Sequence, residues 1–263
     1  MYRRTLIIAA ATLLAGAATQ LASADQSSGP RAVAAAGGLS VSPAIVERTA
    51  RRGATASATV TNTSGRTLRV AVGARPWRQS RTGAVAANRS RRLSGVSVSS
   101  SRFRLASGSS RNVSVRLARV PARRSTYGAL DIVGKPVRRR RGINVAYRLV
   151  SSVRFNPTAR GRRLRLGAGG ARVSGSGGSR VLVLRVRNRG NTVDSIAGSV
   201  SIASARGGRS GTISAVRILP GKVVDLRVAA LSGMPRGRYR AGITLTQRGR
   251  NITSVTRRFR IGR

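Results

Sequence analysis

The chain has 263 residues, of which 51 are Lys or Arg and 5 are Asp or Glu, so its formal net charge is +46. It contains neither Cys nor His, which excludes disulfides, thiol nucleophiles, imidazole bases and the commonest metal ligands. Hydrophobic residues make up 40% of the chain but aromatic residues only 3%, so we expect aliphatic cores.

The positive charge has two explanations. Only Lys135 and Lys222 are lysines, and a GC-rich genome would account for this preference for Arg. It would not account for the scarcity of acidic residues. A field of this strength attracts polyanions such as phosphate polymers, anionic lipid or nucleic acid.

Segment 1–24 has the pattern of a secretory signal peptide. Arg3 and Arg4 precede the apolar run Thr5–Ala18, and Ala22-Ser23-Ala24 forms a cleavage site. The run is shorter than the about 20 residues of a membrane span. We therefore expect export to an extracellular, cell-wall or periplasmic location, with no transmembrane segment in the mature chain and a retained anchor as the alternative. Segment 25–38 is rich in Ser, Gly and Ala, which predicts a disordered N-terminus.

Short alternating strands are expected from residue 39 onward, and no helical pattern occurs outside the signal segment. The run 39–47 alternates and carries Pro43, which is typical of an edge strand. In 96–117, apolar residues alternate with arginines or polar residues on both sides of Gly108. This stretch predicts a hairpin with one apolar and one cationic face.

The strands fall into two related sets. Leu39–Asn62 parallels Leu164–Asn188, and each ends in an Asn/Gly turn. Gly108 and Gly221 occupy matching positions in two further similar stretches. The sequence therefore predicts an all-β protein with two tandem immunoglobulin-like β-sandwich domains after the signal peptide. The predicted segments are a first sandwich at 39–157, a linker at 158–163 and a second sandwich at 164–263.

Two groups of residues are candidate binding sites. Arg138, Arg139, Arg140 and Arg141 form the densest cationic run, which is either an anion clamp or a solvated loop. Arg75, Trp77 and Arg78 form a candidate surface contact, in which the Trp77 ring either stacks on a ligand or fills one end of the core.

Catalysis and specific nucleic-acid recognition are not expected. The acidic residues are scattered, and each lysine lies at a turn, so neither a carboxylate pair nor a Ser–Lys dyad is indicated. Aromatic residues are too few to form a base-stacking platform. We predict no catalytic residues, no metal and no cofactor.

Several phrases of the first set carry a family resemblance. The chain from Leu39 to Arg263 resembles PapD-like periplasmic pilus chaperones, and its first set also resembles the WxL-protein peptidoglycan-binding domains. The matching phrases are Val41–Glu47, Asn62–Gly65, Phe103–Leu117, Tyr127–Leu130 and Tyr147–Pro157.

The resemblance to the chaperones implies two cationic positions that anchor the carboxylate of a client protein. These positions fall on Ile45 and Ser152, and neither residue is a cation. Arg48, Arg148 or Arg154 are the alternatives, and spacing singles out none of them. The dedicated anchor of the family is therefore missing.

Two functions follow from these observations. The first is an exported, non-enzymatic binding protein of the cell envelope whose cationic surface engages an anionic cell-wall polymer or an envelope protein. The alternative is a PapD-like chaperone or assembly partner, which pairs an edge strand with an exported surface or pilus-type protein.

Overall fold

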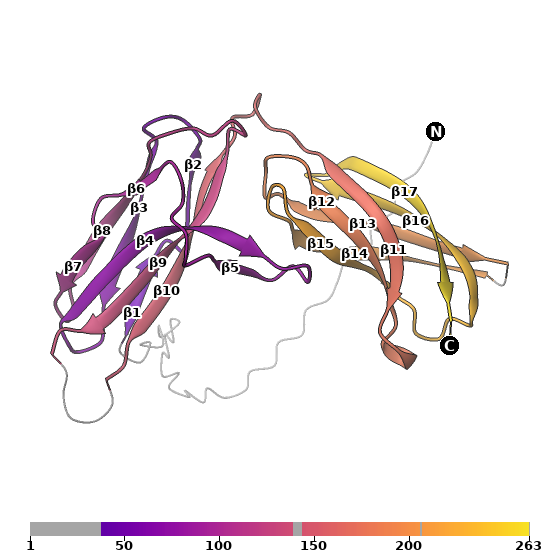
Figure 1. Ribbon diagram of the computed structural model, residues 1–263, viewed down its shortest axis with the longest axis horizontal. Helices are drawn as coiled ribbons and strands as arrows, with labels where there is room; N and C mark the ends of the chain where they lie inside the picture. Colours follow the sequence, from indigo (N-terminus) through magenta and orange to yellow (C-terminus); the bar gives the residue numbers. More distant parts are fainter. Residues whose placement is uncertain (1–37, 139–143, 206, 263) are drawn as a thin grey trace, which may run out of the picture. The chain divides into compact units, whose positions relative to one another are not determined.

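The computed structural model describes residues 38–138, 144–205 and 207–262 (Figure 1). In these described ranges, strands β1–β17 and one short 3₁₀ turn, η1 (Gly177–Ser179), make up the regular structure, so the all-β prediction is confirmed. The predicted signal peptide at 1–24 lies outside the described residues, as does all of segment 25–38 except Gly38. Among the described residues, no helix is long and apolar enough to cross a membrane.

The first sandwich consists of two sheets that share one aliphatic core. Sheet 1 has the order β1-β3-β8-β6, and sheet 2 has the order β2-β10-β9-β4-β5 with β7 also paired to β4. Val70, Val115 and Phe155 are among the buried residues between the two sheets. The strands are β1 (Leu39–Ser42), β2 (Ile45–Thr49), β3 (Thr55–Asn62), β4 (Leu68–Gln79), β5 (Val85–Ala87), β6 (Val96–Val98), β7 (Arg102–Leu105), β8 (Ser110–Leu117), β9 (Thr126–Pro136) and β10 (Tyr147–Asn156).

The run 39–47 forms two strands rather than one. β1 pairs with β3 in sheet 1, whereas β2 pairs in parallel with β10 in sheet 2. The chain changes sheet at the cis peptide bond between Ser42 and Pro43. Pro43 therefore separates two edge segments, because a proline cannot donate a ladder hydrogen bond.

The stretch 96–117 is also divided between the sheets, so the predicted hairpin is wrong. β7 pairs with β4 in sheet 2, while β8 pairs with β3 and β6 in sheet 1. The predicted faces are right, because Phe103 and Leu105 are buried while Arg102 and Arg104 are exposed. Alternation identifies the buried face of a strand, but it does not identify the strand's partner.

The second sandwich repeats this plan with fewer strands. Sheet 3 has the order β11-β12-β15, and sheet 4 has the order β14-β13-β16-β17. The core is aliphatic apart from Tyr239 and Phe259, whose rings stack with centroids 5.5 Å apart. The strands are β11 (Leu166–Ser174), β12 (Val181–Asn188), β13 (Ser195–Ser204), β14 (Gly207–Arg217), β15 (Val223–Ala230), β16 (Gly237–Gln247) and β17 (Arg250–Ile261).

A buried asparagine ends one strand in each sandwich. The Asn62 side-chain amide donates to the carbonyls of Arg66 at 2.8 Å, Leu105 at 2.9 Å and Ala106 at 3.0 Å. The Asn188 amide likewise donates to Thr192 O at 2.8 Å and to Ile218 O at 2.7 Å. Each asparagine therefore ties the end of its strand to a turn and to a distant loop.

Glycine completes the same arrangement in both sandwiches. The amides of Gly108 and Gly221 donate to the backbone carbonyls of Asn62 and Asn188, at 2.7 and 2.8 Å. Both glycines have positive φ, 75° and 80°, a conformation that other residues adopt at a cost. The parallel between the Asn and Gly positions of the two sequence sets thus corresponds to one recurring hydrogen-bond network.

We predict that Asn62→Ala and Asn188→Ala each lower the free energy of unfolding by about 2–3 kcal/mol, because buried carbonyls lose their donor. Urea denaturation of the full chain measures this loss. Thr61→Ala is the control, since its hydroxyl bonds only the exposed Ser110 hydroxyl, at 2.7 Å, and its loss should stay below about 1 kcal/mol. Equal losses for Asn62→Ala and Thr61→Ala would contradict the assigned role.

Candidate functional site

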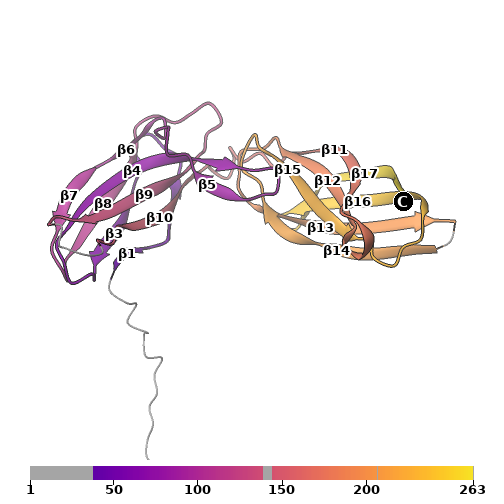
Figure 2. The same ribbon diagram turned by 60° about the horizontal axis from the view of Figure 1, so that its bottom comes forward.

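The last strand of the first sandwich has a free edge along half of its length. β10 pairs with β9 from Tyr147 to Phe155 (Figure 2). Its other side pairs with β2 only from Ser152 to Asn156. Within the described part of the chain, no strand pairs with that side over residues 148–151. This half of β10 is therefore open to an added strand.

The backbone groups at this edge can be assigned from the neighbouring ladder. The Ser152 amide donates to Ala44 O, at 2.8 Å, on the β2 side of the strand. Successive residues of a strand direct their amides to opposite sides, so the amides of Val150 and Arg148 point to the same side as that of Ser152. An incoming strand would pair with the backbone of these two residues.

An apolar row of side chains, interrupted by the buried Ser151, runs along the inward face of β10 and leaves the core at this edge. Phe155 and Val153 are fully buried. Leu149 and Tyr147 are half-buried and pack against the core margin, and Val145 beyond them is 48% exposed. The side chains of one strand face thus pass from core to solvent, where a partner could cover them.

An ion pair on the outward face of sheet 2 holds the free half of β10 against β9. Arg148 donates to Asp131 through Nε at 2.8 Å and through a terminal nitrogen at 2.6 Å. This fork holds the pKa of the Asp131 carboxyl below its usual range, although burial opposes the shift, and the charges of Arg89 and Arg75 add to it. Asp131 is only 6% exposed, so the pair is protected on the carboxylate side.

The positions implied for the client anchor are neighbours in the structure. Ile45 on β2 lies directly opposite Ser152 on β10, and Ile45 is 44% exposed. Of the three alternative arginines, Arg148 is paired with Asp131, and Arg48 donates to the backbone carbonyl of Glu47. Arg154 lies two residues from Ser152 on the same face of β10, which makes it the nearest alternative.

The predicted surface contact is split between two hollows. Trp77 and Arg78 line a hollow of about 530 Å³ together with Val85 and the exposed edge residue Val150. Trp77 is half-buried and does not belong to the described core cluster, so it does not fill the end of the core. Arg75 lines a different hollow.

The predicted arginine run is described only at its first residue. Arg138 is exposed after the end of β9, and Arg139, Arg140 and Arg141 lie outside the described residues. The free edge of β10 was not predicted from the sequence. The alternation of Val145, Tyr147 and Leu149 with polar or small residues signalled the apolar row, but the length of its partner β2 was not visible in the sequence.

The described residues contain no group of three or more carboxylate, thiol or imidazole side chains that could hold a metal ion. The geometry therefore offers backbone and apolar contacts at the β10 edge, together with cationic side chains.

No protein-family model and no curated protein sequence matches the chain. Solved structures do match it. One, from the chaperone–tip adhesin complex in the activation of CFA/I fimbriae biogenesis, has 12% sequence identity and a TM-score of 0.50. The match covers 84% of this chain and 98% of that one. The chain has the fold of two-domain fimbrial chaperones.

Two further matches have lower scores. The class 5 fimbriae chaperone CfaA has 13% identity and a TM-score of 0.48 over 84% of this chain and 98% of that chain. The Escherichia coli chaperone DraB has 14% identity and a TM-score of 0.43 over 86% and 98%. Both of these structures are of chaperones.

We predict that Asp131→Asn lowers the free energy of unfolding at pH 7 by about 1–2 kcal/mol. This loss is smaller than that for a fully buried ion pair, because Arg148 is partly solvated. The folded-state pKa of Asp131 is depressed, so its stabilisation is present above the ordinary carboxyl pKa and is lost as the pH falls through the folded value. Urea denaturation at pH 7, 5 and 3 should therefore show the difference between wild type and variant shrinking below about pH 4.

Asp194→Asn is the matched control, because its closest approach to Arg248 is 3.6 Å and the arginine is exposed. Its loss at pH 7 should be smaller than that of Asp131→Asn. A difference for Asp131→Asn that is as large at pH 3 as at pH 7 would contradict the ion-pair explanation.

Proposed function

We propose that the chain is an exported chaperone or assembly partner that pairs the free edge of β10 with a strand of an exported client protein. The observation that carries this proposal is the coincidence of an unpaired backbone edge and an apolar row on the same half-strand. Backbone pairing at a sheet edge supplies affinity, and side-chain pockets along that edge supply selectivity.

The apolar row indicates what the client must offer. Leu149 and Tyr147 are half-buried and Val145 is exposed, so the row would enter an apolar groove of a client that lacks a covering strand. Burying such a row contributes roughly 25 cal/mol per Å² of apolar surface. The client is therefore expected to be an incomplete sheet protein rather than a short polar peptide.

The anchor positions set this chain apart from the mechanism that the family resemblance implies. Ile45 and Ser152 lie opposite each other and neither is a cation, so these two positions offer no charged donor to a client carboxylate. Arg154 on the same face is opposite both Glu47 and Tyr127 in the two ladders. We infer that backbone pairing and apolar contacts hold the client, with Arg154 as the nearest cation.

The predicted signal segment and the fold support a periplasmic or extracellular location for this activity. Binding to an anionic cell-wall polymer is the competing proposal, and it rests on the net charge of +46 and on the resemblance of the first set to the WxL-protein peptidoglycan-binding domains. The two proposals differ in what they require of β10. Strand pairing needs its backbone amides, whereas a diffuse polyanion contact needs only the arginines and weakens with salt.

The test replaces Val150 in a tagged full-length chain that is exported in its native host. Val150→Pro removes one outward amide without removing a bond to β9, and an edge position tolerates proline. Val150→Thr keeps the amide and the β-branched shape. We expect exported proteins to be recovered with the wild type and with Val150→Thr, and recovery to fall at least tenfold with Val150→Pro.

A photoreactive residue at position 150 tests whether the captured protein contacts the β10 edge. Mass spectrometry of the cross-linked peptides then identifies which segments are joined. The cross-link should join position 150 to an apolar strand of the client. Recovery that is equal for all variants but is abolished by 1 M salt would instead support the polymer-binding proposal.

A further inference from the structure

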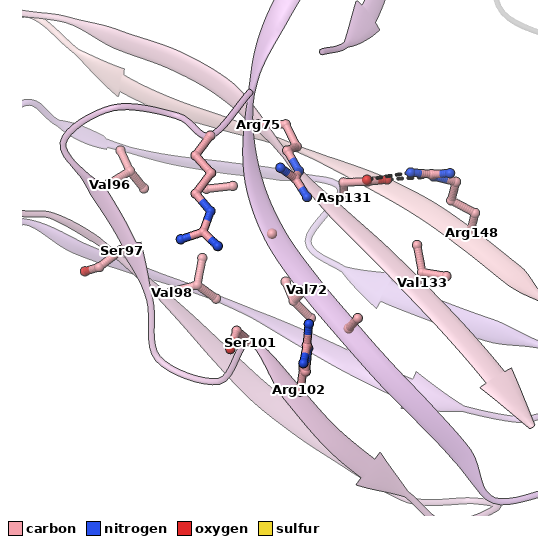
Figure 3. Close-up of a pocket in the computed structure, with 14 residues that line it drawn as sticks. Val72, Arg75, Val96, Ser97, Val98, Ser101, Arg102, Asp131, Val133 and Arg148 are labelled. Atoms are coloured by element: carbon pink, nitrogen blue, oxygen red, sulfur yellow. Dashed lines mark hydrogen bonds and ion pairs between the residues drawn. The ribbon is translucent and has the colours of Figure 1, made fainter. Parts of the chain in front are cut away.

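A second hollow lies around β4 of sheet 2, where it approaches β6 of sheet 1, and the proposed strand pairing does not use it. Its volume is about 690 Å³, within the range of small-ligand pockets (Figure 3). Residues of β4 and β9 form one wall, and the segment 96–102 forms the other. Val72, Val96 and Val98 contribute apolar surface to the lining.

The lining carries four arginines and one acid. Arg75, Arg92, Arg102 and Arg148 all line the hollow, and Asp131 is the acidic member. Asp131 is already bound in the fork of Arg148. Among the described residues, no ion pair joins the other three arginines to an acidic group, so the hollow has a surplus of positive charge.

Arg75 is held in place within this hollow and is incompletely bonded. A Cβ added at Gly73 would lie 3.2 Å from Arg75 Nε, so the guanidinium lies directly against the glycine. One terminal nitrogen donates to Arg91 O at 3.3 Å, whereas Nε is buried without an acceptor. Figure 3 shows Arg75 beside Asp131, with Arg102 across the hollow.

A buried donor without a partner costs free energy, and an anion in the hollow would supply the acceptor. A carboxylate is satisfied by a single guanidinium fork, as Asp131 is by Arg148. Three further arginines exceed the needs of one more carboxylate. A phosphate group offers three oxygens and nearly two negative charges, which fits the surplus better.

We propose that this hollow is a binding site for a phosphate monoester, with Arg75 as the positioned ligand and Arg92 and Arg102 closing around the phosphate from the rim. Ser97 and Ser101 also line the hollow, and the valines accommodate a small carbon body. This site is independent of the proposed strand pairing, because it does not need the backbone edge of β10.

The test measures binding by isothermal titration and by amide chemical shifts of the full chain at constant ionic strength. Inorganic phosphate and glycerol 1-phosphate are the probes, with sodium chloride replaced to hold screening constant. We expect saturable shifts at Gly73 and Ser97. Arg75→Gln and Arg102→Gln should each weaken binding about tenfold, because each removes charged hydrogen bonds.

Two further variants separate a built site from a general positive field. Arg52→Gln removes the same charge from an exposed turn that does not line the hollow, and it should bind like wild type. Gly73→Ala leaves the charge unchanged but displaces the Arg75 guanidinium, so binding should weaken several-fold. Equal weakening by Arg52→Gln and Arg75→Gln, or shifts spread over all arginine-bearing strands, would overturn the proposal.

The source of the phosphate is resolved by comparing probes. Tighter binding of glycerol 1-phosphate than of inorganic phosphate supports a soluble or polymer-borne monoester. Binding to phosphatidylglycerol vesicles that the Arg75→Gln and Gly73→Ala variants leave unchanged, with no response to either small probe, would overturn the proposal, because it would reflect surface charge alone.

Discussion

The buried side-chain amides of Asn62 and Asn188 are the constraint on which both sandwiches depend. Each amide donates hydrogen bonds to a backbone carbonyl of a nearby turn and to one of a loop far away in the sequence. A β-sandwich has to hide the polar backbone of loops that leave its sheets, and a buried carbonyl without a donor is costly. One asparagine per sandwich meets this demand, and Gly108 and Gly221 complete it with their amides.

The free edge of β10 depends on where the chain changes sheet near its first strand. Asn62 ends β3 beside β1, and β1 is followed at once by Pro43 and the change of sheet. The short β2 that results covers only the second half of β10. The open half of β10 therefore follows from the position of a proline and the length of an edge strand, with no specialised loop required.

The sequence was sufficient for the fold class and for the faces of the strands, because alternation and repeated Asn/Gly turns are local signals. Leu105, Val113 and Val115 are buried as their pattern predicts. Strand partners are not local, which is why 96–117 was wrongly predicted to form a hairpin. The edge of β10 and the hollow around Arg75 depend on how distant strands meet, so composition indicated positive charge without indicating where it gathers.

Because acidic residues are scarce, each one has a large influence on which arginines are paired and which are not. Asp131 neutralises Arg148, which belongs both to the open edge of β10 and to the lining of the hollow. This pairing anchors the Arg148 side chain on the sheet face, away from the backbone groups that an incoming strand would use. Among the described residues, Arg75, Arg92 and Arg102 form no ion pair with a carboxylate. A single buried acid thus separates an edge suited to a protein strand from a hollow suited to an anion.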